Sequence, residues 1–341
     1  MPRVLVVGTG SIGRRHVRNL VAMGMDVCAY RYRMSSMPAE PLPTGVSLLA
    51  ELDDESLSAF DAVVVANRTD LHLPVALKAA RCGAALFIEK PLAVSLSNTA
   101  ELLAIVDRRQ LVVEAGFMLR LHPNLQWIKR FLLEDGLGPL HYMRACVGQF
   151  LPDWRAGTDH RSGYSARRAW GGGVIFDLVH ELDLVGWLGG EVEEVVAMVR
   201  HVPSLEIETE AIAQVGLRLG GGLLAQVHLD YVRPDFSRTL EVVGSKGSLV
   251  WDYRKGHVVL TASASGPAVV HRVPAEFDRN DMFCAHMGHF VERVKGSGAQ
   301  PVSSLEEATE TLRVALACHA AAHERRSVRP SDVDVDYQVQ G

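Results

Sequence analysis

The chain begins with a short apolar run, residues 4–7, that leads into the turn Gly8-Thr9-Gly10-Ser11-Ile12-Gly13, and a helical pattern follows over 12–23. Three glycines at this spacing allow a tight turn, a close approach to the backbone, and close packing of the helix on the strand. The free N–H groups at the start of such a helix attract phosphate. We expect a dinucleotide cradle here, although a flavin site, a methyltransferase site or a plain tight turn gives a similar pattern.

Strands and helices alternate up to about residue 118. Strand-like runs lie at 4–7, 27–30, 62–66, 85–88 and 111–115, and helical patterns at 12–23, 71–82 and 95–109. This alternation predicts an α/β Rossmann domain over residues 1–119, built on a doubly wound parallel sheet.

The pattern changes after residue 120. Longer strand-like runs lie at 141–150, 193–202, 209–219, 222–233, 238–244, 247–253, 257–262 and 268–273. Helical patterns lie at 123–134, 174–188, 280–295 and 304–323. We expect an α+β domain over residues 120–341, for substrate binding and oligomerisation. Its large, mostly antiparallel open sheet would carry helices on one face.

Composition excludes several classes of function. A net charge of −5 provides no basic field for nucleic acid. The five cysteines are scattered without CxxC spacing, which favours a reduced, cytoplasmic protein without a metal site. The most apolar helical stretch, 174–188, contains four ionisable residues, so we expect no membrane span.

The end of the second strand normally discriminates between the two nicotinamide cofactors. An acid there binds the ribose 2′-hydroxyl of NAD, whereas an arginine accommodates the 2′-phosphate of NADP. The chain reads Ala29-Tyr30-Arg31-Tyr32-Arg33, with no acid before Glu40. Arg31 and Arg33 favour NADP over NAD, with a solvated basic loop as the alternative.

Lys90 follows the strand-like run 85–88, at the carboxyl end where open α/β sheets bind ligands. Pro91 restricts the backbone of Lys90 and so fixes where its ammonium points. Burial and a nearby positive charge disfavour the charged form of a lysine, so its amine could polarise a substrate oxygen. The alternative is a surface lysine in a turn.

Asp177 and His180 are three residues apart on the predicted helix 174–188, so they share a face. A carboxylate beside an imidazole orients it and supports its charged form, which suits acid/base work on a hydroxyl proton. The preceding Gly171-Gly172-Gly173 would let a ligand approach closely. A purely structural Asp–His pair is the alternative.

These motifs together resemble the Gfo/Idh/MocA oxidoreductase family over nearly the whole chain. The matching segments are Gly8-x-Gly10-x-x-Gly13-x-x-His16, Thr69-Asp70-Leu71-His72, Phe87-Ile88-Glu89-Lys90-Pro91-Leu92, Gly116-Phe117-x-x-Arg120-x-His122-Pro123, and Gly171-Gly172-Gly173 with Asp177, His180 and Asp183. The resemblance implies that Lys90 is the family lysine, that its bond to Pro91 is cis, and that His180 is the acid/base with Asp177 beside it. It also implies a homo-oligomer, a dimer or tetramer, formed through the open sheet.

The sequence departs from the family pattern at two places. Asp177 and His180 are three apart where the family more often spaces them four apart, and Asn67-Arg68 replaces the commoner Thr-Pro. The residues expected to bind the cofactor are Gly8, Gly10, Ser11, Ile12, Gly13, Arg31, Arg33, Asn67, His72, Glu89 and Lys90. Those expected on the substrate side are Arg120, His122, Trp154, Tyr164 and Arg167.

The resulting hypothesis is hydride transfer between nicotinamide and a hydroxyl or carbonyl carbon of a sugar, polyol or sugar derivative. Lys90 would polarise the oxygen, His180 would exchange the proton, and Asp177 would orient His180. Two alternatives stay open: a redox-neutral enzyme with a tightly held cofactor, and a non-catalytic NAD(P)-sensing regulator.

Overall fold

The computed structural model describes residues 1–32, 41–155, 157–262, 266 and 268–340. The chain divides into two compact units. Unit 1 comprises residues 1–118 and 278–309, and unit 2 comprises residues 119–277 and 310–341. The predicted domain boundary between residues 119 and 120 lies one residue from the boundary between the two units, which falls between 118 and 119. The segment 278–309 was predicted to lie in the second domain but belongs to unit 1.

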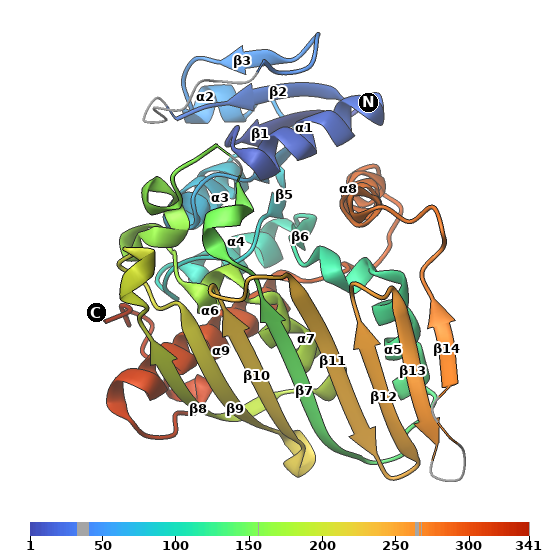
Figure 1. The fold of residues 1–341 in the computed structure, drawn as a ribbon. Coiled ribbons are helices and arrows are strands. Elements are labelled where there is room, and N and C mark those ends of the chain that lie inside the picture. Colours follow the sequence, from blue (N-terminus) through green and yellow to red (C-terminus); the bar gives the residue numbers. More distant parts are fainter. Residues whose placement is uncertain (33–40, 156, 263–265, 267, 341) are drawn as a thin grey trace. The chain divides into compact units, whose positions relative to one another are not determined.

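Unit 1 contains a fully parallel six-stranded sheet in the order β3-β2-β1-β4-β5-β6, as in Figure 1. Its strands are β1 (Arg3–Val7), β2 (Asp26–Tyr30), β3 (Ser47–Leu49), β4 (Ala62–Val65), β5 (Ala85–Ile88) and β6 (Val113–Ala115). Its helices are α1 (Ser11–Ala22), α2 (Asp54–Leu57), α3 (His72–Arg81), α4 (Thr99–Arg109) and α8 (Arg279–Val294). The Rossmann prediction is confirmed. Among the described elements, the short edge strand β3 and the single-turn α2 are additional to it, because three or four residues carry little periodicity.

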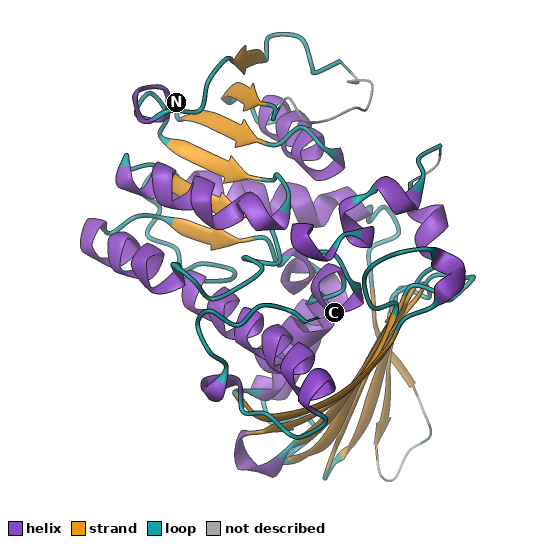
Figure 2. Cartoon of the chain, turned by 90° about the vertical axis from the view of Figure 1, so that its left-hand side faces the viewer, coloured by secondary structure: helices purple, strands orange, loops and turns teal. Residues whose placement is uncertain are grey.

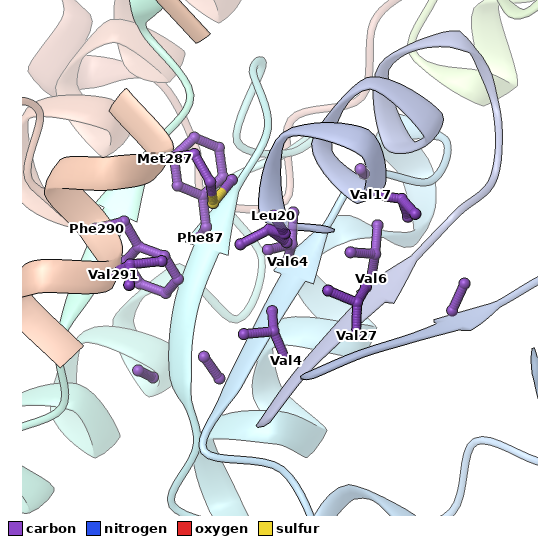
Figure 3. Close-up of a cluster of buried hydrophobic side chains, with 14 residues drawn as sticks. Val4, Val6, Val17, Leu20, Val27, Val64, Phe87, Met287, Phe290 and Val291 are labelled. Atoms are coloured by element: carbon purple, nitrogen blue, oxygen red, sulfur yellow. The ribbon is translucent and has the colours of Figure 1, made fainter. Parts of the chain in front are cut away.

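The position of α8 follows from its apolar face. Met287, Phe290 and Val291 are buried in one cluster with Phe87 of β5 and Leu20 of α1 (Figure 3). Val4 and Val6 of β1, Val27 of β2 and Val64 of β4 belong to the same cluster. Helical periodicity revealed that α8 has an apolar face, but not which core that face joins.

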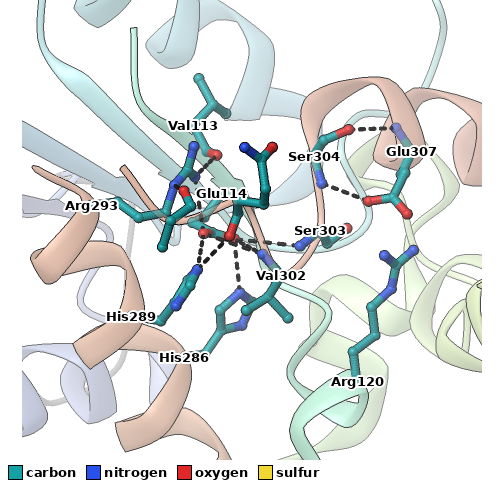
Figure 4. Close-up of polar contacts among 12 residues, drawn as sticks. Val113, Glu114, Arg120, His286, His289, Arg293, Val302, Ser303, Ser304 and Glu307 are labelled. Carbon is teal, nitrogen blue, oxygen red and sulfur yellow. Dashed lines mark hydrogen bonds and ion pairs between the residues drawn. The ribbon is translucent and has the colours of Figure 1, made fainter. Parts of the chain in front are cut away.

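Polar contacts of Glu114 also join α8 to the first sheet (Figure 4). This β6 side chain is fully buried, and its carboxylate lies 3.3 Å from His286 Nε2 and 3.0 Å from Arg293 Nη1. It also accepts the Val302 N–H at 3.1 Å. Because a buried carboxylate needs such partners, Glu114 ties α8 and the segment after it to β6.

Unit 2 contains an eight-stranded sheet in the order β14-β13-β12-β11-β7-β10-β9-β8, antiparallel except for the β7–β10 pair. Its strands are β7 (Leu140–Gly148), β8 (Val192–Arg200), β9 (Ile212–Leu219), β10 (Leu224–Asp230), β11 (Ser237–Gly244), β12 (Gly247–Asp252), β13 (His257–Ala262) and β14 (Ala268–Arg272). The predicted open, mostly antiparallel sheet is confirmed.

Helices of unit 2 gather on one face of this sheet (Figure 2). They are α5 (Pro123–Leu133), α6 (Val174–Asp177), α7 (His180–Gly189) and most of α9 (Leu305–Glu324). The predicted helix 174–188 is therefore two helices, separated by a turn at residues 178–179. Across the described part of the chain, no helix is both long and apolar enough for a membrane crossing.

Candidate active site

The glycine turn leaves space beside one glycine and none beside the other two. A Cβ on Gly8 would lie 2.5 Å from the Ala66 oxygen, and one on Gly13 would lie 1.9 Å from the Gly8 oxygen. A Cβ on Gly10 would meet no heavy atom of the described residues within 4 Å. Among the residues that the structure describes, no side chain caps the α1 N-terminus, and the first turn of α1 holds no acid. The N–H groups at Ser11 and Ile12 thus start an uncapped helix beside open space, which fits a pyrophosphate.

Arg31 lies directly after β2, beside this turn. Its Nε donates a 2.8 Å hydrogen bond to Thr9 Oγ1. The guanidinium is therefore tied to the glycine turn, where a cofactor ribose would approach. Arg33, the second predicted phosphate partner, lies outside the described residues.

His72 joins two loops at the carboxyl ends of neighbouring strands. Its Nδ1 lies 2.9 Å from the Pro91 carbonyl oxygen and its Nε2 lies 3.2 Å from that of Asn67. The ring is buried, and burial lowers the pKa of His72. His72 thus holds the chain just after Lys90 against the end of β4. The Asn67 side chain turns back to donate to the Leu71 oxygen at 3.3 Å.

Glu89 is buried beside the half-buried Lys90, and the Lys90–Pro91 bond is cis, as the resemblance implied. Glu89 Oε1 lies 2.7 Å from His16 Nε2, and Oε2 accepts the Lys90 N–H at 3.3 Å. Burial opposes ionisation of Glu89, but His16 and the charges of Lys90 and His72 hold its pKa below the ordinary value. Glu89 is therefore an ionised, buried carboxylate that contacts the Lys90 backbone.

In unit 2, the predicted acid/base pair lies at the junction of two helices. Asp177 is the last residue of α6 and His180 the first of α7, and each is only 4% exposed. Tyr231, directly after β10, donates a 2.6 Å hydrogen bond to Asp177 Oδ2. Burial and the Asp177 charge raise the pKa of Tyr231 well above its usual value, so the phenol stays a donor. The carboxylate is thus held on one side by a buried phenol.

Glu210 lies against the glycines that precede α6. Its Oε1 accepts the Ile175 N–H at 3.1 Å, and a Cβ on Gly173 would lie 2.4 Å from that oxygen. A Cβ on Gly172 would lie 2.2 Å from the Tyr164 carbonyl oxygen. These two glycines therefore make room for the protein's own carboxylate and loop. The close approach of a ligand at this helix start stays a prediction.

Two aromatic residues of the loop 151–168 lie around the Asp177–Tyr231 pair. The Trp154 ring meets the Tyr231 ring edge-on at 5.3 Å. Burial, with the Asp177 charge, raises the pKa of Tyr164, and the Arg155 guanidinium stacks 5.2 Å above the Tyr164 ring. Trp154 thus lies against Tyr231, and Tyr164 lies beside Asp177.

The other three predicted substrate-side residues make ion pairs or cap a helix within the chain. Arg120 is 3% exposed and makes a two-pronged contact with Asp183, at 2.7 and 3.1 Å. His122 caps α5 by accepting the Asn124 N–H at 3.2 Å, and burial lowers its pKa to about 3. Arg167 forms an exposed ion pair with Glu208. The structure does not bring these three together.

Two residues close to Asp177, Tyr231 and Glu210, were not predicted as site residues. Both lie at the edges of strand-like runs, where sequence alone suggests a core position for a tyrosine and a surface position for a glutamate. An acid at the start of an otherwise apolar strand was the one available signal. Within the described ranges, no group of three or more His, Cys, Asp or Glu residues could hold a metal ion.

Comparisons with known proteins agree with both units. The model for the oxidoreductase family with an NAD-binding Rossmann fold matches residues 2–117, and that for the GFO/IDH/MocA C-terminal domain matches residues 125–250. The chain is 26% identical over 347 residues to scyllo-inositol 2-dehydrogenase (NAD(+)) of Bacillus subtilis (strain 168), covering 98% of this chain and 96% of that protein. It is 25% identical over 350 residues to myo-inositol 2-dehydrogenase of Thermotoga maritima, covering 97% and 99%.

The fold also matches solved structures. Levoglucosan dehydrogenase in complex with NADH superposes with a TM-score of 0.83 at 18% identity, covering 97% of this chain and 100% of that chain. With each unit matched by its own family model, this chain belongs to the Gfo/Idh/MocA family of sugar and polyol oxidoreductases, and its first domain is an NAD-binding Rossmann fold.

Proposed function

We propose that this protein is an NAD(P)-dependent dehydrogenase that interconverts a hydroxyl and a carbonyl group of a sugar, polyol or sugar derivative. The observation that carries the proposal is the buried Asp177–Tyr231 hydrogen bond three residues before a buried histidine. Burying a carboxylate carries a desolvation cost even when it is hydrogen-bonded, and titratable groups in such environments cluster at functional sites.

Lys90 polarises the substrate oxygen in this proposal. It stands at the carboxyl end of β5, where ligands bind in open α/β sheets, and its backbone is held by Glu89 and, through Pro91, by His72. An amine donor aimed at an alkoxide-like oxygen stabilises the charge that develops there. The nicotinamide cofactor supplies the hydride acceptor or donor when bound.

His180 exchanges the hydroxyl proton. A histidine is suited to this because its ordinary pKa lies near neutrality. Asp177 orients the imidazole and stabilises its charged form, while Tyr231 holds the Asp177 carboxylate from the other side. Trp154 and Tyr164 then offer apolar ring surface for a sugar.

The substrate class comes from the relatives. The two that match nearly the whole chain are named as inositol 2-dehydrogenases. Cyclic polyols and sugars are therefore the first compounds to test. The identity of about a quarter leaves the individual compound open.

The choice between NAD and NADP depends on Arg31. The missing acid and the arginine favour NADP, whereas the Bacillus subtilis relative is named for NAD(+) and the levoglucosan dehydrogenase structure is a complex with NADH. The ratio of kcat/KM for the two cofactors in wild type and in Arg31→Ala decides. If the ratio of kcat/KM with NADP to kcat/KM with NAD falls in the variant, Arg31 is assigned to a 2′-phosphate. If this ratio is unchanged, the NADP preference is withdrawn.

We also propose a homo-oligomer in the cytoplasm, formed through the face of the eight-stranded sheet opposite the helices. Exposed apolar side chains on these strands include Tyr142, Val196, Leu224 and Val250. Sedimentation of the wild type and of Val196→Lys tests the oligomer, and fractionation of the native cells tests the location.

The function itself is tested by the near-ultraviolet absorbance of the reduced cofactor, against a panel of inositols, sugars, uronic acids and nucleotide sugars. A signal with one compound class names the substrate. No signal from protein that binds cofactor would favour internal redox cycling or a regulator instead.

A further inference from the structure

The buried pair His16–Glu89 lies between the helix of the glycine turn and Lys90. We propose that His16 and Glu89 are positioning residues, and that their buried contact couples α1 to the backbone of Lys90 and so holds the lysine in place. This inference rests on the role given to Lys90 in the proposed function. It gives Glu89 a role other than the predicted contact with the cofactor.

On the α1 side of the pair, the His16 ring is buried and held by its neighbours. His16 is 1% exposed, and its Nε2 lies 2.7 Å from Glu89 Oε1. Its Nδ1 has no hydrogen-bond partner among the described residues, which assigns the donated proton to Nε2. The ring also meets Phe87 of β5 edge-on at 5.2 Å. His16 therefore has one polar contact, and that contact is Glu89.

The other Glu89 oxygen faces the next residue. Oε2 accepts the Lys90 N–H at 3.3 Å. A Cβ on Gly116 would lie 2.9 Å from the same oxygen, so the backbone after β6 closes over the carboxylate. Glu89 has little freedom to rotate, and a displacement of His16 would be transmitted to the Lys90 backbone.

Glu89 acts on Lys90 through its charge as well as through its hydrogen bond. The ionisable groups that face Glu89 are His16 from α1, His72 from α3, and Lys90. A fixed negative charge favours the protonated form of a neighbouring amine. Removing that charge should therefore make the Lys90 amine reactive at lower pH.

The test follows the reactivity of Lys90 directly. Full-length protein without added cofactor is trace-acetylated with acetic anhydride across a pH series, and the Lys90 peptide is quantified by mass spectrometry. Exposed Lys255 serves as the internal reference. In Glu89→Gln we expect the midpoint of Lys90 labelling to fall by about one pH unit. In His16→Asn it should fall by a smaller amount, and not further when the two changes are combined.

His286→Asn is the matched control. His286 also contacts a buried glutamate, Glu114, at 3.3 Å (Figure 4). It meets the same Phe87 ring at 4.9 Å. Glu114 contacts α8 and the backbone N–H groups of Val302 and Ser303. A general loss of packing therefore appears in this variant as well, but an effect that runs through Glu89 does not.

An unmoved midpoint in both Glu89→Gln and His16→Asn, or an equal shift in His286→Asn, would overturn the inference. If Glu89→Gln does not fold, His16→Asn against His286→Asn decides alone. A different result, full turnover in Lys90→Met, would contradict the proposed function. The labelling midpoints are measured in proteins that keep Lys90, so the two results are independent.

Discussion

The phenol of Tyr231 donates a 2.6 Å hydrogen bond to the carboxylate of Asp177, and both side chains are buried. The two residues come from the end of β10 and the end of α6, which are 54 positions apart in the sequence. The contact holds the acid of the proposed acid/base pair on a strand of the large sheet.

Replacing Tyr231 with Phe should therefore reduce both stability and turnover. Loss of a hydrogen bond to a buried charged group costs about 1–3 kcal/mol of unfolding free energy. We expect kcat to fall by about tenfold or more, because Asp177 then orients His180 less well. Tyr253→Phe, in the same unit, is the control, and urea unfolding with steady-state kinetics provides the measurement. Equal kcat values in the two variants would remove Tyr231 from the proposed mechanism.

Glu210 should give the protein a pH-dependent loss of stability. Burial, with the Asp177 charge, raises its pKa to about 7 from 4.5. The folded protein then keeps a proton that the unfolded chain releases. The stability linked to this proton is fully present below about pH 4.5 and is lost as the pH rises towards about 7, a change of about 3 kcal/mol.

Glu210→Gln should abolish that loss. Relative to wild type, the variant gains stability as the pH rises from about 5 to about 8. Urea unfolding at both pH values measures this difference. Glu208→Gln, which removes an exposed carboxylate two residues away, is the control. If the free energy of unfolding has the same pH dependence in wild type and Glu210→Gln, Glu210 does not titrate between about pH 5 and about pH 8.

Gly173 should tolerate no side chain. Its φ is +109°, and a Cβ would lie 2.4 Å from Glu210 Oε1. Gly173→Ala should lose about 1–2 kcal/mol from the backbone strain and about 1–3 kcal/mol more from overpacking. Gly190→Ala, at φ +100° in the same region of backbone conformation and with no heavy atom of the described residues within 4 Å of its Cβ, should lose only the first part. Thermal unfolding of both variants compares them, and equal losses would rule out the clash with Glu210.

The parallel sheet, the antiparallel sheet and most helix bounds could be predicted because each depends on local periodicity. The position of α8 could not, since an apolar face at Met287 and Phe290 fits either core equally well. The break between Asp177 and His180 also lacks a local signal, because Leu178 and Val179 are ordinary helix residues in sequence.

The candidate site divides in the same way. Lys90, Asp177 and His180 stand in recognisable motifs, so residue type and spacing were sufficient to nominate them. Tyr231 and Glu210 act through contacts with residues far away in the sequence, and no single segment contains both partners. Gly173 was recognised as special, but its reason, room for a carboxylate 37 positions later, depends on the tertiary structure.

The central claim is that Lys90 and His180 carry the chemistry while the glycine turn binds the cofactor. The most direct measurement is substrate turnover beside cofactor binding in wild type, Lys90→Met and His180→Asn. We expect cofactor dissociation constants within about threefold of one another and turnover lower by about 100-fold or more in each variant. Full turnover in either variant, on a substrate that wild type uses, would contradict it.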